Sequence, residues 1–430
     1  MFGSPRDALA RGVTMIAQEP ALVPARSVIE NVFLGLEPRA VSIVRQGELR
    51  RRFESLIERT GIEMDPQRTV RTLSLADRQK VSILQAVARE AELIVMDEPT
   101  ASLTMNEAER LFNVVRTLAD RGTTIVYVSH ALDEVLRLVD TVTTLKDGRV
   151  VRTAPAGRET TASLVAGMLG ESLDEMFPVK SQVSPEAASV LEIESLRRSR
   201  GSGSISLAIK RGEIVGIAGL GGSGRTELAR AIFGAPPPES GTIRVNGERV
   251  VIRSPRDAIR AGIALLPEDR KSQGLLMRRS IADNVTLPHL YRKRSFKPVR
   301  PRTDARAVKP LVQHLNIRTD SLSTHVESLS GGNQQKVLFA KWLLEPPHVL
   351  IADEPTRGVD IGAKRFIYQL IASLAAEGLA VLLISSELEE LLGLTHRICV
   401  MRGGSIVDQF EGDWANQADI LTAALGATAA

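Results

Sequence analysis

An internal repeat constrains the fold of this 430-residue chain more than any other feature. The pentad Ser4–Ala8 recurs as Ser254–Ala258, at an offset of 250 residues. Further along, the block Val95–Thr100 matches Ile351–Thr356, at an offset of 256 residues. Because several blocks recur in one order, we predict two copies of one domain, with a net insertion in the second.

The two copies differ in length. The second copy is expected to begin near Val190, after a stretch rich in Ser, Pro and Ala. By the offset, about 60 residues of the second copy have no counterpart in the first. We therefore expect a first domain over 1–156 that lacks its N-terminal strands and phosphate-binding loop, a linker over 157–189, and a complete second domain over 190–430.

A glycine-rich loop lies between an apolar run, Ile214–Ala218, and a helical pattern that begins at Glu227. Glycines let backbone N–H groups turn toward phosphate oxygens, and a helix N-terminus adds partial positive charge. The loop fits the pattern GxxxxGK[ST], except that an arginine replaces the lysine. The predicted phosphate-binding residues are Gly219, Gly221, Gly222, Ser223, Gly224, Arg225 and Thr226.

Two apolar runs each end in a pair of acids, Asp97-Glu98 and Asp353-Glu354. Such runs are typical of strands buried on both faces of a parallel sheet. The aspartate of each pair is a candidate Mg²⁺ ligand, as is Thr226. The glutamate of each pair is a candidate for orienting and deprotonating an attacking water.

A third motif, Leu329–Lys336, precedes the second acidic pair and runs into a helical pattern. Ser330, Gly331 and Gly332 would present a hydroxyl and bare backbone N–H groups at a helix N-terminus, which suits a γ-phosphate. Since the glycine-rich loop already surrounds phosphates from one side, a second anion-binding helix suggests closure across a dimer interface.

With these motifs the chain resembles the ATP-binding subunit of an ABC importer, specifically the twin-cassette subunits of the ribose/galactose/xylose type. The resemblance covers essentially the whole chain, and Arg225, Pro267–Leu275 and Ser385–Glu387 are similar to that group's second cassette. It implies an α/β fold of two P-loop (RecA-like) ABC ATPase domains, each with an antiparallel β portion and a helical subdomain.

The resemblance also implies roles for single residues. In this family each ATP lies between the P-loop of one cassette and the signature helix of the other. Gln18 resembles the Q-loop glutamine and His130 the switch histidine, so both join Glu98 and Glu354 as catalytic candidates. Gln334 joins the signature residues that would contact the nucleotide.

Several positions depart from the family pattern. By the repeat offsets, Glu268 stands at the place of Gln18, and Ser386 stands at the place of His130. In the first copy's signature, Asp77 would repel a γ-phosphate. We therefore expect the chain as given to hydrolyse ATP poorly or not at all.

Composition narrows the remaining function classes. A single cysteine, Cys399, excludes an internal disulfide and any cysteine-based zinc site. Aromatic residues make up only 3% and the formal charge is +4, which argues against nucleic acid as a partner. The resemblance instead implies ATP and Mg²⁺ as cofactors, and permease subunits with an external sugar-binding protein as partners. The expected location is peripheral, at the cytoplasmic face of the inner membrane.

The expected function is to couple ATP binding and hydrolysis to the uptake of a monosaccharide. Two alternatives stay open: a nucleoside ABC importer ATPase, which is similar in plan, and a cytosolic twin-cassette translation factor. The latter class carries a long charged connector between its cassettes, whereas the stretch 157–189 is short and not strongly basic. A nucleotide-binding regulator without turnover is a further alternative.

Overall fold

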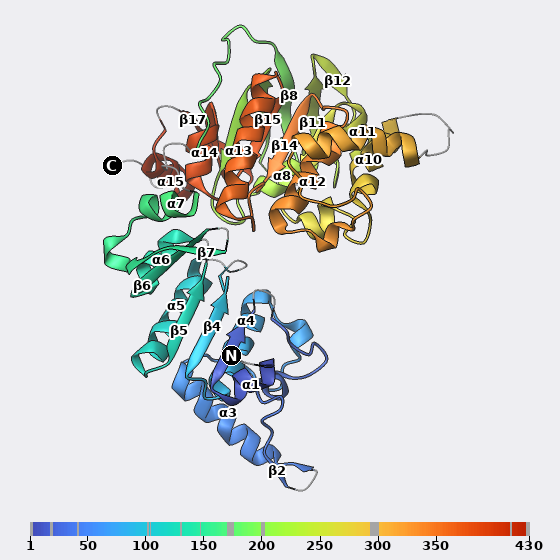
Figure 1. The fold of residues 1–430 in the computed structure, drawn as a ribbon. Helices are drawn as coiled ribbons and strands as arrows, with labels where there is room; N and C mark the ends of the chain where they lie inside the picture. The colour runs from blue at the N-terminus through green and yellow to red at the C-terminus, as the bar shows by residue number, and fades with distance from the viewer. Residues whose placement is uncertain are drawn as a thin grey trace. The chain divides into compact units, whose positions relative to one another are not determined.

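In the computed structural model the chain forms two compact units, unit 1 (Met1–Ser172) and unit 2 (Leu173–Ala430) (Figure 1). The structure describes residues 3–17, 20–40, 43–100, 103, 105–129, 131–146, 148–169, 176–198, 203–292, 301–412 and 415–426.

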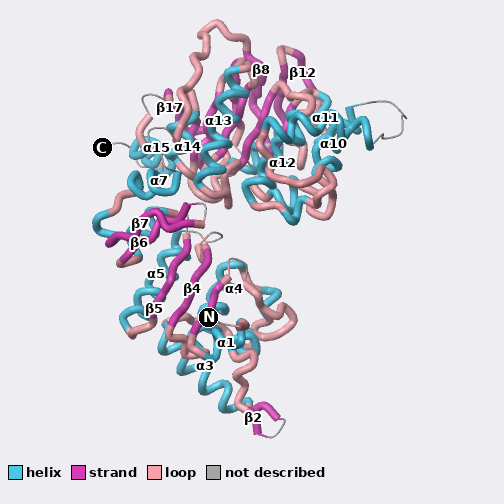
Figure 2. The backbone as a smooth tube through the Cα atoms, viewed as in Figure 1, coloured by secondary structure: helices cyan, strands magenta, loops and turns pink. Residues whose placement is uncertain are grey.

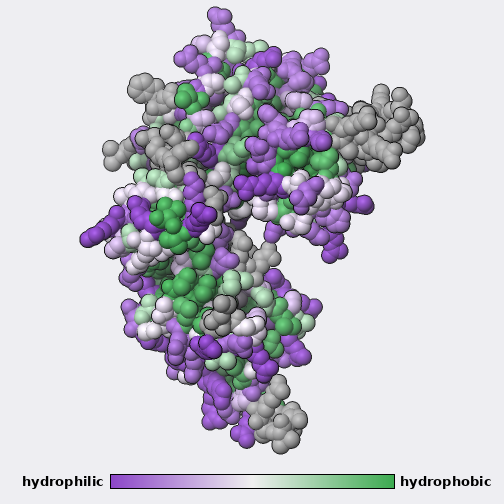
Figure 3. Space-filling view, in the orientation of Figure 1, coloured by the Kyte–Doolittle hydropathy of each residue, from purple (hydrophilic) through white to green (hydrophobic). Residues whose placement is uncertain are grey.

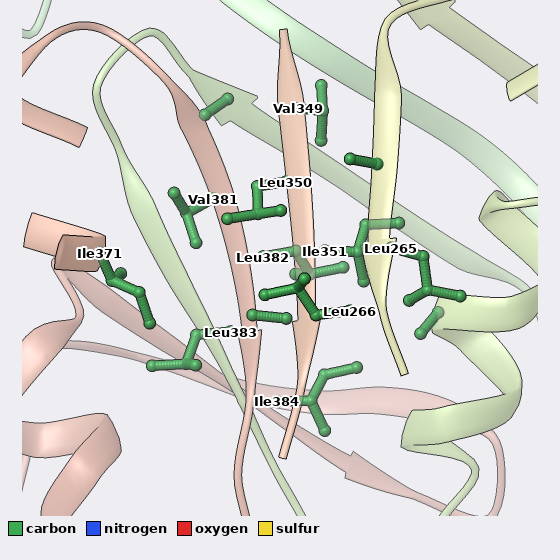
Figure 4. Close-up of a cluster of buried hydrophobic side chains, with 14 of the residues drawn as sticks. Leu265, Leu266, Val349, Leu350, Ile351, Ile371, Val381, Leu382, Leu383 and Ile384 are labelled. Carbon is green, nitrogen blue, oxygen red and sulfur yellow. The ribbon is translucent and has the colours of Figure 1, made fainter. Parts of the chain in front are cut away.

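Unit 2 is built on a six-stranded sheet. Its strands follow the spatial order β13 (Ile263–Leu266), β14 (Val349–Asp353), β15 (Ala380–Ile384), β10 (Ile214–Ala218), β16 (Arg397–Arg402) and β17 (Ser405–Glu411). All neighbours are parallel except β16 and β17. Every residue of β10, β14 and β15 is buried, as predicted for apolar strands covered on both faces. Figure 4 shows the buried side chains of Leu350 and Ile351 on β14 beside that of Leu382 on β15.

A second, antiparallel sheet and a group of helices complete unit 2. The sheet has the order β12 (Glu248–Val250), β11 (Ser240–Val245), β8 (Ser189–Arg197) and β9 (Ile205–Lys210). The helices are α8 (Arg225–Ile232), α9 (Pro255–Arg260), α10 (Ile281–Arg292), α11 (Pro301–His314), α12 (Gly331–Leu343), α13 (Ile361–Ala376), α14 (Leu388–Leu394) and α15 (Gln417–Leu425). Because α10, α11 and α12 pack against one another, they form the helical portion that the resemblance implied.

Unit 1 repeats part of this plan. Its parallel sheet has the order β1 (Val13–Ile16), β4 (Leu93–Asp97) and β5 (Thr124–Val128), which matches β13, β14 and β15 (Figure 2). Two hairpins pair β2 (Arg39–Ala40) with β3 (Ile43–Val44) and β6 (Thr141–Lys146) with β7 (Arg149–Pro155). The helices are α1 (Pro5–Ala10), α2 (Val28–Val32), α3 (Gln46–Thr60), α4 (Leu75–Ala88), α5 (Met105–Asp120), α6 (Leu132–Leu138) and α7 (Thr161–Leu169).

The units differ at the place that β10 occupies in unit 2, between β15 and β16. In the described part of unit 1, no strand lies between the corresponding β5 and β6, and a groove of about 850 Å³ opens there. Val126 and Val128 of β5 are each 45% exposed, whereas every residue of β15 is buried. Hydrophobic residues accordingly gather on the surface of unit 1 around this strand (Figure 3).

The stretch predicted as a linker, 157–189, contains regular structure. Helix α7 forms within it and packs against β6, because it buries Leu164 and Val165. These residues therefore belong to unit 1 and not to a linker. Within the described ranges, every helix is too short or too polar to cross a bilayer.

Candidate functional site

The glycine-rich loop of unit 2 joins β10 to α8, as the sequence predicted. Gly219, Gly222 and Gly224 have φ angles of +154°, +78° and +100°, which favour glycine. Packing adds a second requirement at Gly219, where a side chain would meet backbone, but not at Gly224, where it would meet only the end of a flexible side chain. A Cβ at Gly219 would lie 2.5 Å from the Met401 carbonyl oxygen, and one at Gly224 would lie 2.7 Å from the Arg198 guanidinium. A Cβ at Gly221, by contrast, would meet nothing within 4 Å.

The first residues of α8 connect the loop to the ends of two core strands. Arg225 Nη1 donates to the Ser385 carbonyl oxygen at 2.7 Å, just beyond β15. Thr226 Oγ1 donates to Asp353 Oδ1 at 3.3 Å, at the end of β14. Within the described residues, the buried Ser223 hydroxyl has no hydrogen-bond partner, so it is available to a phosphate oxygen.

The two acids after β14 lie beside this loop. Asp353 is only 1% exposed, and burial raises its pKa to about 7. Burial also raises the pKa of Glu354, whose Oε2 accepts from Ser386 Oγ at 3.1 Å. A carboxylate with a raised pKa is a better proton acceptor near neutral pH.

The acidic turn has the same geometry in both units. Glu354 and Glu98 have positive φ angles of 49° and 44°, although neither is a glycine. The N–H of Glu354 donates to the Ile384 carbonyl oxygen at 2.9 Å, and that of Glu98 donates to the Val128 carbonyl oxygen at 2.8 Å. The neighbouring strand therefore holds each glutamate in a conformation that L residues rarely adopt.

The donors around Asp353 suit Mg²⁺, because carboxylate and hydroxyl oxygens are its preferred protein ligands. In the described part of the chain, no three His, Cys, Asp or Glu side chains gather as a cluster for a metal ion. Mg²⁺ in nucleotide sites takes few protein ligands and completes its shell with phosphates and water. Thr226 and Asp353 therefore fit the ion as a pair that acts together with a nucleotide.

Helix α12 begins with a tightly packed pair of glycines, after Ser330 as its N-cap. A Cβ at Gly331 would lie 2.8 Å from Arg270 Nη2, and one at Gly332 would lie 2.8 Å from Ala363 Cβ. Ser330 Oγ accepts from the Asn333 amide at 3.0 Å and makes no cap bond to the α12 backbone. Backbone N–H groups at this end of α12 thus lack a side-chain cap from Ser330 and suit an anion.

The corresponding helix of unit 1, α4, is already capped. Ser74 Oγ accepts from the N–H of Asp77 at 3.1 Å, and the Asp77 carboxylate pairs with Lys80 at 2.8 Å. The hydrogen bond from Lys80 lowers the pKa of Asp77, so this carboxylate stays ionised at the helix N-terminus. A negative side chain at this position disfavours a second anion, and the repulsion of a γ-phosphate by Asp77 stays a prediction.

The predicted contact of Gln334 with a nucleotide stays a prediction, and the structure shows which groups this side chain contacts within unit 2. Gln334 is buried, and its amide donates to the carbonyl oxygens of Val326 at 3.3 Å and Leu329 at 3.0 Å. Its Oε1 accepts from Arg270 Nε at 3.4 Å. All three contacts lie within unit 2, and those to Val326 and Leu329 hold the turn before α12 in place.

Two other predicted residues, Gln18 and His130, lie outside the described residues. Their counterparts in unit 2 are described. Glu268 forms an ion pair with Arg357, and the Ser386 hydroxyl group donates a hydrogen bond to the Glu354 carboxylate. Asp97 and Glu98 lie at the end of β4, both half-buried.

Sequence reasoning missed a glutamate that supports the acidic turn in each unit, buried in unit 2 and half-buried in unit 1. Glu390 is 1% exposed and accepts from Thr356, from Tyr368 at 2.6 Å and from Ser385 at 2.7 Å. In unit 1, Glu134 accepts from Thr100 at 2.7 Å. The signal was present, because both Thr–Glu pairs follow the offset of 256 residues.

A glycine-rich loop between a parallel strand and a helix, beside a threonine and a buried aspartate, defines unit 2 as a P-loop nucleotide-binding domain. The family model described as "ABC transporter" matches residues 3–101 and 203–357, in both units. The chain belongs to the ABC transporter family. The family and the α/β fold predicted from the motifs are therefore confirmed, and with them the class of ABC-type ATPases.

Three similar proteins are import ATP-binding proteins by name. A protein of Agrobacterium fabrum, named for ribose, galactose and methyl galactoside import, is 45% identical over 426 residues, covering 99% of this chain and 84% of the relative. A ribose import ATP-binding protein of Rhodococcus jostii is 43% identical, over 100% and 85%. Another from Rhizobium meliloti is 46% identical, over 94% and 79%.

Proposed function

We propose that this chain is the ATP-binding subunit of an ABC importer that couples ATP binding and hydrolysis to the uptake of a monosaccharide. The observation that carries the proposal is the phosphate loop of unit 2 with Thr226 bonded to the buried Asp353. The names of the relatives support the ribose/galactose class of solute. Permease subunits and an external sugar-binding protein are its proposed partners, at the cytoplasmic face of the membrane.

In unit 2 the loop residues Gly219–Gly224 bind the phosphates through backbone N–H groups, and the Arg225 guanidinium offsets their charge. Thr226 and Asp353 are the residues that would hold Mg²⁺. When bound, this ion neutralises part of the phosphate charge. Glu354 orients a water and accepts its proton, for which its raised pKa is suited.

The proposed roles in unit 1 follow the repeat. Asp97 is the candidate Mg²⁺ ligand, and Gln18, Glu98 and His130 are the candidate catalytic residues. In unit 2, Ser386 occupies the position that corresponds to His130 in the repeat. Its hydroxyl group donates a hydrogen bond to Glu354, the proposed general base. We accordingly propose that unit 2 binds nucleotide but turns it over slowly, below about 1 s⁻¹, the low end of typical enzymes.

Solute uptake tests the proposal directly. Deleting the gene should abolish uptake of labelled ribose or galactose by the source cells, and the wild-type gene should restore it. The Asp353→Asn variant should restore less, whereas Arg278→Ala, a change at an exposed residue away from the phosphate loop, should restore as much as the wild type. Unchanged monosaccharide uptake in the deletion strain would refute the proposal.

The same strain separates the alternatives. Loss of nucleoside uptake with normal sugar uptake would assign the chain to the nucleoside importers. Sedimentation of the chain with ribosomes, and not with membranes that carry a permease, would assign it to the translation factors.

A further inference from the structure

Arg270 lies in unit 2 two residues after Glu268, in a π-helical turn over Arg270–Gly274. Single π-helical turns are rare in proteins, and those that occur are often found at functional sites. Asp269 fixes the start of the turn, because its Oδ1 accepts from the N–H groups of Lys271 at 3.0 Å and Ser272 at 3.2 Å. At the other end, Lys341 of α12 donates to the Gly274 carbonyl oxygen at 2.7 Å. We refer to residues 268–274 as the post-β13 segment.

The Arg270 guanidinium spans two further elements. Its Nη1 donates to the Arg357 carbonyl oxygen at 2.7 Å, and its Nη2 donates to the Gly358 carbonyl oxygen at 3.1 Å. These carbonyls belong to residues 356–360, the loop that follows the acidic turn. Its Nε donates to Gln334 Oε1 at 3.4 Å, in the first turn of α12.

The half-buried guanidinium lies close to the first glycine of α12. A Cβ at Gly331 would lie 2.8 Å from Arg270 Nη2 and 3.0 Å from the Gly358 carbonyl oxygen. Burial lowers the pKa of Arg270, which records the cost of desolvating its charge. Fixed hydrogen bonds to three acceptors offset that cost, and a planar fork loses less freedom in making them than a flexible ammonium does.

The connection is specific to unit 2. By the offset of 250 residues, Pro20 stands at the place of Arg270 in unit 1, and a proline side chain has no hydrogen-bond donor. In unit 2, Glu268, two residues before Arg270, also contacts the 356–360 loop, through its ion pair with Arg357. The post-β13 segment therefore holds the 356–360 loop by two neighbouring side chains.

We propose that Arg270 is a positioning residue that makes the post-β13 segment, the 356–360 loop and the phosphate-facing end of α12 move as one body. A displacement of the segment then shifts the Ser330–Gly332 backbone together with the loop. This inference rests on the proposed function for its consequence, because it is the nucleotide that would sense the shift. The mechanical connection itself can be measured without turnover.

Hydrogen exchange of the full chain tests the connection. In Arg270→Ala, amides of the 356–360 loop and of residues 334–337 should both exchange faster, by about tenfold or more, because local opening no longer breaks the guanidinium bonds. Arg270→Lys should rescue this only in part, since one ammonium cannot reach all three acceptors as the fork does. The matched control is Arg278→Ala, at an exposed arginine nearby, and should leave both regions unchanged.

Adding Mg·ATP separates coupling from mere stability. In the wild type, nucleotide should slow exchange in the glycine-rich loop, the post-β13 segment and the first turn of α12. In Arg270→Ala the effect should stop before α12, while protection of the glycine-rich loop persists. If α12 still responds in Arg270→Ala, or if only the 356–360 loop loosens without nucleotide, the inference is wrong. If the glycine-rich loop is never protected, the proposed function fails instead.

Discussion

At the scale of single residues, the pKa of Asp353 makes the stability of unit 2 depend on pH. Its pKa is about 7 in the folded chain, against about 3.9 for an unfolded aspartate. The folded state therefore binds the proton more tightly, and its stability falls as pH rises from about 4 to 7. Above pH 7 the full cost of burying the charge remains.

We predict that Asp353→Asn raises the stability of unit 2 at pH 8 by about 1 to 3 kcal/mol, because the amide removes the buried charge. The gain should vanish near pH 4, where the native carboxyl is neutral as well. The same substitution should weaken Mg·ATP binding, since a Mg²⁺ ligand is lost. Urea unfolding at pH 4 and pH 8 measures the first effect, and an equal gain at both values would contradict it.

Glu390 carries a second prediction at this scale. Glu390→Ala removes the acceptor of three buried hydroxyl groups, from Thr356, Tyr368 and Ser385, and leaves their hydroxyl hydrogens without this acceptor. We expect a loss of about 3 kcal/mol or more in the free energy of unfolding. Glu389→Ala, at the exposed neighbour, should cost less than about 0.5 kcal/mol. Similar losses for the two variants would show that the hydroxyl network contributes little.

At the scale of elements, β5 lies at the edge of its sheet, and we expect this edge to promote aggregation. Long apolar edges promote pairing with other chains, and a lysine on such an edge blocks it. Val126→Lys should therefore reduce aggregation while changing stability by less than about 0.5 kcal/mol, because the side chain is 45% exposed. The matched control is Leu382→Lys at the repeated position in β15, which is fully buried and should unfold unit 2. Light scattering and urea unfolding measure the two effects.

The sequence allowed several elements of the site to be predicted, but not the long-range contacts between them. The phosphate loop was predictable because positive φ angles at Gly219 and Gly224, and close backbone packing at Gly219, demand glycine locally. The acidic ends of β4 and β14 were predictable from apolar runs that end in charge. The inward direction of Gln334 and the reach of Arg270 were not, because the partner carbonyls at positions 357 and 358 are 87 and 88 residues away in sequence. Only the packed fold brings them together.

At the scale of the whole molecule, two compact units with separate cores should unfold in two transitions, since neither shares its core with the other. Mg·ATP at a hundred times its dissociation constant should stabilise the unit that binds it by about 2.7 kcal/mol. We expect this shift in unit 2, which holds the glycine-rich loop, and no comparable shift in unit 1. Differential scanning calorimetry with and without Mg·ATP measures both transitions.

Variants assign those transitions and make the prediction refutable. Arg225→Ala should abolish the nucleotide-dependent shift, because the guanidinium that offsets phosphate charge is gone, while the two transitions persist. Leu382→Lys should remove the unit 2 transition and leave that of unit 1. If Mg·ATP raises both transitions equally in the wild type, nucleotide acts on the chain as a whole, and the assignment of binding to unit 2 is wrong. A shift confined to one transition, and lost in Arg225→Ala, would locate nucleotide binding at the glycine-rich loop.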